Sequence, residues 1–285
     1  MDNISRRPVS PGRQGSMSRA GKRRVEWSAT TELAMPDAFA IASMDPHPDV
    51  FMQASGFARQ DVSEAGPVPA AYEAAFYVLQ ASNHASASLE AYTFTADGAD
   101  ANVGQGRGAR SDFSIGINPD DGRLMLTLSG GRALEAATAA DTYEAAASQS
   151  RAVTYYADKP FLSSGMYCLI VSLAAGGEVI YGGGSRATPS NTFQVVSMTI
   201  NGGMSPTEQT GISATSGVAR QRLAPTDPVT MSISIEEALI AASGDQFDPY
   251  QLRDNETPIE IRLSSEQLDI SGNTNKLTIN AFGQI

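Results

Sequence analysis

Phe113–Ile117 (FSIGI), Asn118–Gly122 (NPDDG) and Arg123–Ser129 (RLMLTLS) follow one another without interruption. In the last of these segments apolar and polar residues alternate, as they do in a strand with one buried face. The middle segment holds the residue types that tight turns need, because Pro presets φ, Asn and Asp bond back to the chain, and Gly allows positive φ. Together the three segments predict a β-hairpin.

Strand patterns recur on both sides of this hairpin. They are separated by short turns rich in Gly, Pro and Asn, which antiparallel strands use in place of helical crossovers. We therefore expect a β-rich α+β fold, mainly an antiparallel sandwich or a jelly-roll-like body. The other predicted strands are Val25–Met35, Ala38–Met44, Leu89–Thr95, Ala152–Tyr156, Met166–Leu173, Glu178–Tyr181, Thr192–Ile200, Val229–Ile235, Pro258–Leu263 and Lys276–Phe282.

About three helices are predicted among these strands. In Ala70–Ala81 the residues Tyr72, Phe76 and Leu79 are spaced four and three apart, as on one face of a helix. Arg132–Ser150 is rich in Ala and carries scattered acidic residues, and Glu236–Ser243 is a short segment that Gly244 ends. Both patterns favour helices.

Three other stretches read as irregular. Asp97–Arg110 contains Gly104-Gln-Gly-Arg-Gly108, which lacks the spacing of a dinucleotide loop and the Lys of a P-loop, so we expect a mobile surface loop there. Gly202–Gly217 is polar and reads as a long loop. Asp45–Asp49 contains two prolines and reads as a rigid connector.

The charge of the chain is divided between a short basic segment and a long acidic one. Residues 1–24 hold seven basic residues and one acid, or +6, whereas residues 25–285 hold thirteen basic and thirty acidic residues, or −17. We expect residues 1–24 to be a flexible, extended N-terminal arm that contacts nucleic acid or a neighbouring subunit. Residues 25–285 form a single β-rich body, and any boundary within it falls near residue 150. The arm contacts are assigned to Arg6, Arg7, Arg13, Arg19, Lys22, Arg23 and Arg24.

Catalytic and metal-binding patterns are missing from the sequence. Cys168 is the only cysteine and lies in an apolar run, which predicts a buried strand thiol. His47 and His84 are the only histidines, and no Gly-x-Ser-x-Gly elbow, zinc motif or EF-hand spacing occurs. We therefore predict a protein that is not an enzyme and that needs no cofactor or metal. No 18-residue apolar run predicts a membrane span, and no secretory signal is expected.

Three functions fit these features. The first is a structural protein of a virus particle, a capsid or shell-associated protein that self-assembles. Its expected partners are copies of itself and other particle proteins, with packaged nucleic acid as a further candidate through the N-terminal arm. Such a protein is assembled in the host cytoplasm or nucleus and resides in the virion. The second is a tail, neck or tube component of a tailed bacteriophage, and the third is a carbohydrate-binding or hydrolytic β-domain. The shape of the assembled protein distinguishes the first function from the second, and a glycan-binding measurement tests the third.

Overall fold

The fold is mainly antiparallel β-sheet with few helices, as the sequence predicts. The computed structural model describes residues 3–6, 17–20, 24–36, 48–64, 72–80, 82, 84–94, 101–135, 158–173, 177–181, 193–210, 218–235, 247–268 and 274–285. The helices are α1 (Asp49–Ala54), α3 (Pro249–Asp254) and the 3-10 turn η2 (Ser163–Gly165). The strands are β1 (Asn3–Arg6), β2 (Met17–Ala20), β3 (Arg24–Glu32), β4 (Ala34–Pro36), β5 (Phe57–Glu64), β6 (Tyr72–Leu79), β7 (Ala87–Phe94), β8 (Ala101–Ile117), β9 (Leu124–Glu135), β10 (Asp158–Pro160), β11 (Met166–Ser172), β12 (Val179–Tyr181), β13 (Phe193–Asn201), β14 (Met204–Thr210), β15 (Val218–Pro225), β16 (Thr230–Ile235), β17 (Ile259–Leu268) and β18 (Thr274–Gly283).

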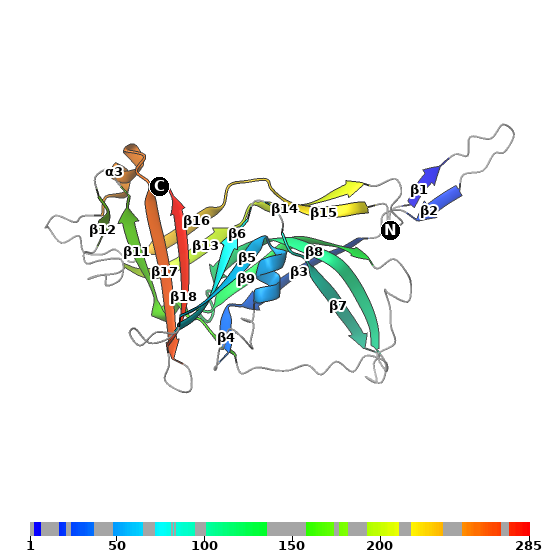
Figure 1. The fold of residues 1–285 in the computed structure, drawn as a ribbon, viewed down its shortest axis with the longest axis horizontal. Helices are drawn as coiled ribbons and strands as arrows, with labels where there is room; N and C mark the ends of the chain where they lie inside the picture. The colour runs from blue at the N-terminus through cyan, green and yellow to red at the C-terminus, as the bar shows by residue number, and fades with distance from the viewer. Residues whose placement is uncertain are drawn as a thin grey trace.

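One ten-stranded sheet organises the body. Its main path runs β18-β17-β11-β13-β8-β9-β3, and β12, β16 and β7 pair with β11, β13 and β8. This path joins strands from both sides of residue 150. Four separate two-stranded sheets complete the described strands, namely β1-β2, β4-β10, β5-β6 and β14-β15. Figure 1 shows β1 and β2 at one end of the long axis, and α3, β11 and β12 toward the other.

The predicted hairpin is confirmed as the pairing of β8 with β9. Its turn is closed by the Asn118 amide donating to the Arg123 carbonyl at 2.8 Å and by the Gly122 amide donating to the Asn118 carbonyl at 2.9 Å. Gly122 has φ of 72°, a conformation in which a side chain would be strained. The turn residues therefore adopt the hydrogen bonding and backbone conformation that their residue types predict.

Both strands of this hairpin are longer than predicted. Gly130 has φ of 58° and lies where the pairing of β9 shifts on both of its edges, which marks a β-bulge. The strand passes through this bulge and continues to Glu135. The predicted end of this strand at Ser129 is therefore wrong.

Two predicted loops are also strands where the structure describes them. Residues 101–110 of the predicted mobile loop belong to β8, and residues 204–210 of the predicted long loop form β14, which pairs with β15. Their Gly and polar content misled the prediction, because pairing along both edges, as in β8, stabilises strands of weak intrinsic preference. Residues 97–100 and 211–217 lie outside the described residues.

The helix predicted over Ala70–Ala81 is wrong, because residues 72–79 form strand β6. The segment fits both periods, but aromatic and β-branched side chains favour a strand when a partner is present. Antiparallel pairing with β5 supplies that partner. The helix predicted over Arg132–Ser150 is wrong for residues 132–135, which belong to β9, while residues 136–150 and Glu236–Ser243 lie outside the described residues.

All strands on the main path of the ten-stranded sheet contribute to one hydrophobic core. Leu124, Leu126 and Leu128 of β9 are completely buried, and they share one cluster with residues of β8, β11, β13 and β17. Cys168 of β11 belongs to this cluster, so the prediction of a buried strand thiol is confirmed. Burial raises the pKa of Cys168 to about 12, which leaves its sulfur protonated and unreactive at neutral pH.

Candidate functional site

Helix α1 and the β5-β6 hairpin lie together against the hydrophobic core of the body, and we call them the α1–β5–β6 unit (Figure 1). Among the described strands, β5 and β6 pair only with each other. A two-stranded hairpin is marginally stable by itself, so the unit depends on contacts beneath it. One of these is aromatic: the ring of Phe57 lies 4.8 Å from the ring of Phe113 on β8, centroid to centroid.

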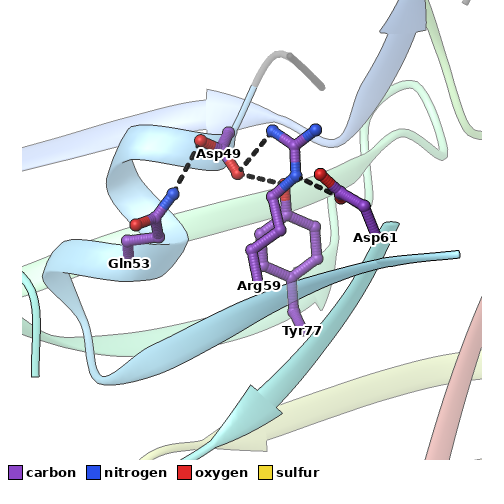
Figure 2. A network of polar contacts seen from close by, with 5 residues as sticks. All are labelled: Asp49, Gln53, Arg59, Asp61 and Tyr77. Carbon is purple, nitrogen blue, oxygen red and sulfur yellow. Dashed lines mark hydrogen bonds and ion pairs between the residues drawn. The ribbon is translucent and has the colours of Figure 1, made fainter. Parts of the chain in front are cut away.

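A polar network lies between the helix and the hairpin (Figure 2). Asp49 is the first residue of α1 and only 5% of its surface is exposed. One carboxylate oxygen accepts a hydrogen bond from the Tyr77 hydroxyl at 2.5 Å, and the same oxygen forms an ion pair with Arg59 Nη1 at 3.3 Å. The other accepts from Gln53 Nε2 at 2.8 Å. Arg59 Nε also donates to Asp61 at 2.6 Å.

This network fits a structural role. Buried charges are tolerated in proteins when they are paired and hydrogen-bonded, and both oxygens of Asp49 have protein partners. The partners come from the helix (Gln53) and from both strands of the hairpin (Arg59 and Tyr77), so a single carboxylate fixes three elements. Both oxygens of Asp49 therefore bond to side chains of the protein itself, and the network holds the hairpin in one orientation.

Over residues 58–62 and 74–78, the opposite face of the hairpin has no charged side chain. Because alternate residues of a strand point to opposite faces and paired residues share a face, Arg59 and Tyr77 lie inward and their neighbours lie outward. We call the outward set the outer face; Phe76 is 49% exposed and Val78 is 50% exposed on it. The outer face consists of Ala58, Gln60, Val62, Ala74, Phe76 and Val78.

The predicted arm residues are only partly described. Arg6 ends β1, Arg19 lies in β2 and Arg24 begins β3. β1 and β2 pair antiparallel, with Ile4 opposite Arg19. Arg7, Arg13, Lys22 and Arg23 lie outside the described residues. The role of the arm stays a prediction.

Other site types have no candidate in the described part of the chain. There, no three or more His, Cys, Asp and Glu side chains are grouped as metal ligands would be. No helix within the same residues combines the length and the hydrophobicity needed to cross a membrane. The predicted strand Ala152–Tyr156, the strand Ala38–Met44 and His47 lie outside the described residues.

Comparisons with protein-family models and with curated proteins gave no match at a significant level. The proposals below therefore depend on the geometry and the chemistry of this chain.

The α1–β5–β6 unit was missed by sequence reasoning, which placed a connector at Asp45–Asp49, a helix over Ala70–Ala81 and no strand between them. Both described α-helices begin beside an adjacent Asp and Pro, but so do the hairpin turn at Pro119-Asp120 and the irregular residues Asp227-Pro228, so this local signal is not specific for helices. At α3, Pro249 occupies the first position and Asp248 accepts a hydrogen bond from the Tyr250 amide at 3.0 Å. At α1, Pro48 directly precedes Asp49, whose charge favours the positive end of the helix.

Proposed function

We propose that this chain is a non-enzymatic structural protein of a virus particle, a capsid or shell-associated subunit that self-assembles. Its body is a sandwich or jelly-roll-like β-structure, and its basic N-terminal arm contacts neighbouring subunits or packaged nucleic acid. The partners are copies of itself and other particle proteins, with no membrane. The subunit assembles in the host cytoplasm or nucleus and resides in the virion.

The observation that carries this proposal is the outer face of the α1–β5–β6 unit. Contact surfaces of proteins have centres that are depleted in charge and enriched in aromatic residues. Phe76 and Val78 are half exposed on a face that carries no charged residue over 58–62 and 74–78, although the chain as a whole carries a net charge of −11. The Asp49 network beneath this face fixes its orientation, which lowers the entropy that a subunit contact must overcome.

The second candidate is a tail, neck or tube component of a tailed bacteriophage. The observation that favours it is the open end of the ten-stranded sheet at β18, since subunits of rings and tubes can share a sheet. In this candidate the arm clasps a neighbour rather than nucleic acid. Electron microscopy of the purified protein separates the two candidates, because closed shells support the first and rings or tubes support the second.

The outer face is tested by making it polar. We expect the double variant Phe76→Gln, Val78→Thr to lose assembly while keeping the melting temperature of the body within a few degrees, because both side chains are half exposed. Light scattering coupled to size exclusion gives the molar mass, and circular dichroism gives the melting curve. The matched control, Val196→Thr with Tyr250→Gln, removes two other exposed apolar side chains and should assemble like the wild type. A wild-type protein that stays monomeric at high micromolar concentration would refute the proposal.

The arm is tested by deleting residues 1–23, which keeps Arg24 paired with Leu134 at the start of β3. We expect the body to fold and particle assembly or nucleic-acid retention to fail, because a closed shell multiplies seven weak charges by its copy number. Empty particles assign the arm to nucleic acid, and absence of particles assigns it to a subunit contact. Replacing the seven basic residues by Gln, with the length kept, separates charge from chain length. Wild-type particle yield and nucleic-acid content in both variants would contradict the prediction.

A further inference from the structure

Strand β18 is an open edge of the ten-stranded sheet. It pairs with β17 over its whole length, from Gly283 opposite Ile259 to Thr274 opposite Leu268, and the register has no shift. The sheet ends at β18, so in the described part of the chain no strand pairs with its other edge. A long, regular edge of this kind exposes backbone groups that another strand can bind.

The usual protections of an edge strand are weak in β18. Proteins protect edges with proline, bulges or charged side chains, especially lysine, whereas the ten residues of β18 include no proline, no bulge and a single charged residue, Lys276, near one end. The Lys276 ammonium is turned toward the interior of the sheet, where it lies 3.1 Å from the Glu266 carboxylate of β17 and donates to the Tyr167 hydroxyl of β11 at 2.9 Å. The strand at the other end of the sheet, β3, differs because its pairing with β9 is bulged between Trp27 and Ala29.

The two faces of β18 have distinct chemistry. Leu277 and Ile279 are half-buried and pack against the hydrophobic core, whereas Thr278 and Asn280 of the alternate face are exposed. Phe282 lies on the exposed face with 69% of its surface accessible, the largest fraction among the exposed large apolar side chains of the described residues. A partner strand must therefore present apolar side chains on the face of Leu277 and Ile279. On the other face it must present polar side chains opposite Thr278 and Asn280, and a side chain that packs against the ring of Phe282.

We propose that β18 pairs antiparallel with β18 of a second copy, across a two-fold axis at Ile279. Opposite residues of antiparallel strands share a face, so this axis places Ile279 opposite its own copy and Leu277 opposite Ala281 on the core side. On the exposed side Thr278 lies opposite Asn280, where their polar groups can bond. The pairing joins the two ten-stranded sheets into one.

The charge and the exposed ring of β18 are also matched by this register. Lys276 lies opposite Phe282 of the second copy, so the lysine methylene stem can cover the ring while its ammonium keeps its contacts with Glu266 and Tyr167. No like charges are opposed. An axis one pair further along, at Asn280, would leave Lys276 opposite Gln284 and Thr278 opposite Phe282, which gives neither contact.

The pairing is one way for the proposed structural protein to self-associate, and it depends on that function only through self-association. It is tested on the full chain by disulfide trapping with Thr278→Cys and Asn280→Cys proteins, one of them carrying a mass tag. Opposite residues have Cβ atoms about 5 Å apart, close to disulfide reach. We expect the mixture to form the tagged–untagged disulfide dimer, and each variant alone to form little.

The native thiol does not compete in this experiment, because Cys168 is completely buried. The control mixture, Ser197→Cys with Thr199→Cys, uses two exposed positions on the interior strand β13 and should give no dimer. Absence of the mixed disulfide overturns the inference. A disulfide dimer formed efficiently by Thr278→Cys alone or by Asn280→Cys alone also overturns the inference. Such a dimer would show that the two-fold axis lies at another residue or that the two strands are not paired antiparallel.

A second variant measures the strength of the pairing. Thr278→Lys with Asn280→Lys places ammonium groups opposite each other across the axis, and we expect dimerisation to weaken by about tenfold or more in sedimentation equilibrium. Ser197→Lys with Thr199→Lys is the matched control and should leave dimerisation unchanged. If the wild type assembles and the β18 variants assemble equally well, the inference fails and the proposed function stands. If the wild type forms the trapped dimer but no particle, the inference stands and the proposed function fails.

Discussion

Replacement of Asp49 by alanine is expected to lower the free energy of unfolding by about 2 to 4 kcal/mol. Breaking a buried ion pair costs about 3 to 5 kcal/mol because one charge stays buried, and here Arg59 keeps its contact with Asp61, which reduces the cost. The substitution removes the acceptor shared by Tyr77, Arg59 and Gln53. Urea denaturation followed by circular dichroism measures the change.

The location of the effect is as informative as its size. Because the α1–β5–β6 unit forms no strand pairing with the main sheet in the described residues, loss of Asp49 should speed hydrogen exchange in β5 and β6 far more than in β8 and β9. Asp61→Asn is the matched control, since the Asp61 side chain is 44% exposed and its ion pair is worth under about 1 kcal/mol. Equal destabilisation by both variants would show that the Asp49 network does not fix the hairpin.

Replacement of Gly131 by alanine is expected to destabilise the protein by about 2 kcal/mol or more. A Cβ at this buried position would lie 2.5 Å from Cε2 and 2.7 Å from Cδ2 of Trp27, both atoms of a rigid ring. Overpacking of this kind costs about 1 to 3 kcal/mol, because side chains or backbone must move. Trp27 is the only tryptophan, so its fluorescence reports both the local change and the unfolding transition.

Two controls isolate the contact with the ring. Gly283→Ala adds the same methyl group where nothing lies within 4 Å, and its effect should be close to zero. Trp27→Leu removes the ring, so Gly131→Ala should cost much less in that background, a non-additive result typical of residues in contact. Additive effects of the two substitutions would contradict a direct clash.

Local patterns predicted those strands in which the apolar residues of the sequence lie on the face that the fold buries. β11, β16 and β18 alternate or run apolar, and each was found within a few residues of its predicted bounds, while β9 begins beside its predicted start but runs past its predicted end. Prediction failed where pairing, rather than composition, makes the strand. The Gly-rich start of β8 and the polar β14 have weak preferences of their own, and each becomes a strand through its partner.

The candidate site lay beyond sequence reasoning for a similar reason. Tyr72, Phe76 and Leu79 fit a helical stripe, but β6 turns Phe76 outward and Tyr77 inward, where its hydroxyl meets Asp49, 28 residues earlier in the chain. Nothing local indicates that contact. Residues 1–24 are the opposite case, because their positive charge is evident from the sequence, whereas their contact with nucleic acid or a neighbouring subunit stays a proposal.

The sequence by itself determined the antiparallel β-rich class, the hairpin turn at Asn118–Gly122, the buried thiol of Cys168 and the division between a basic arm and an acidic body. These properties follow from residue type and short-range spacing. Only the tertiary structure decided that Phe76 and Val78 face outward, that Asp49 is buried beneath them and that β18 ends the sheet. Those features depend on which distant segments pair and in what register, and a shift of one residue along a strand would exchange its two faces.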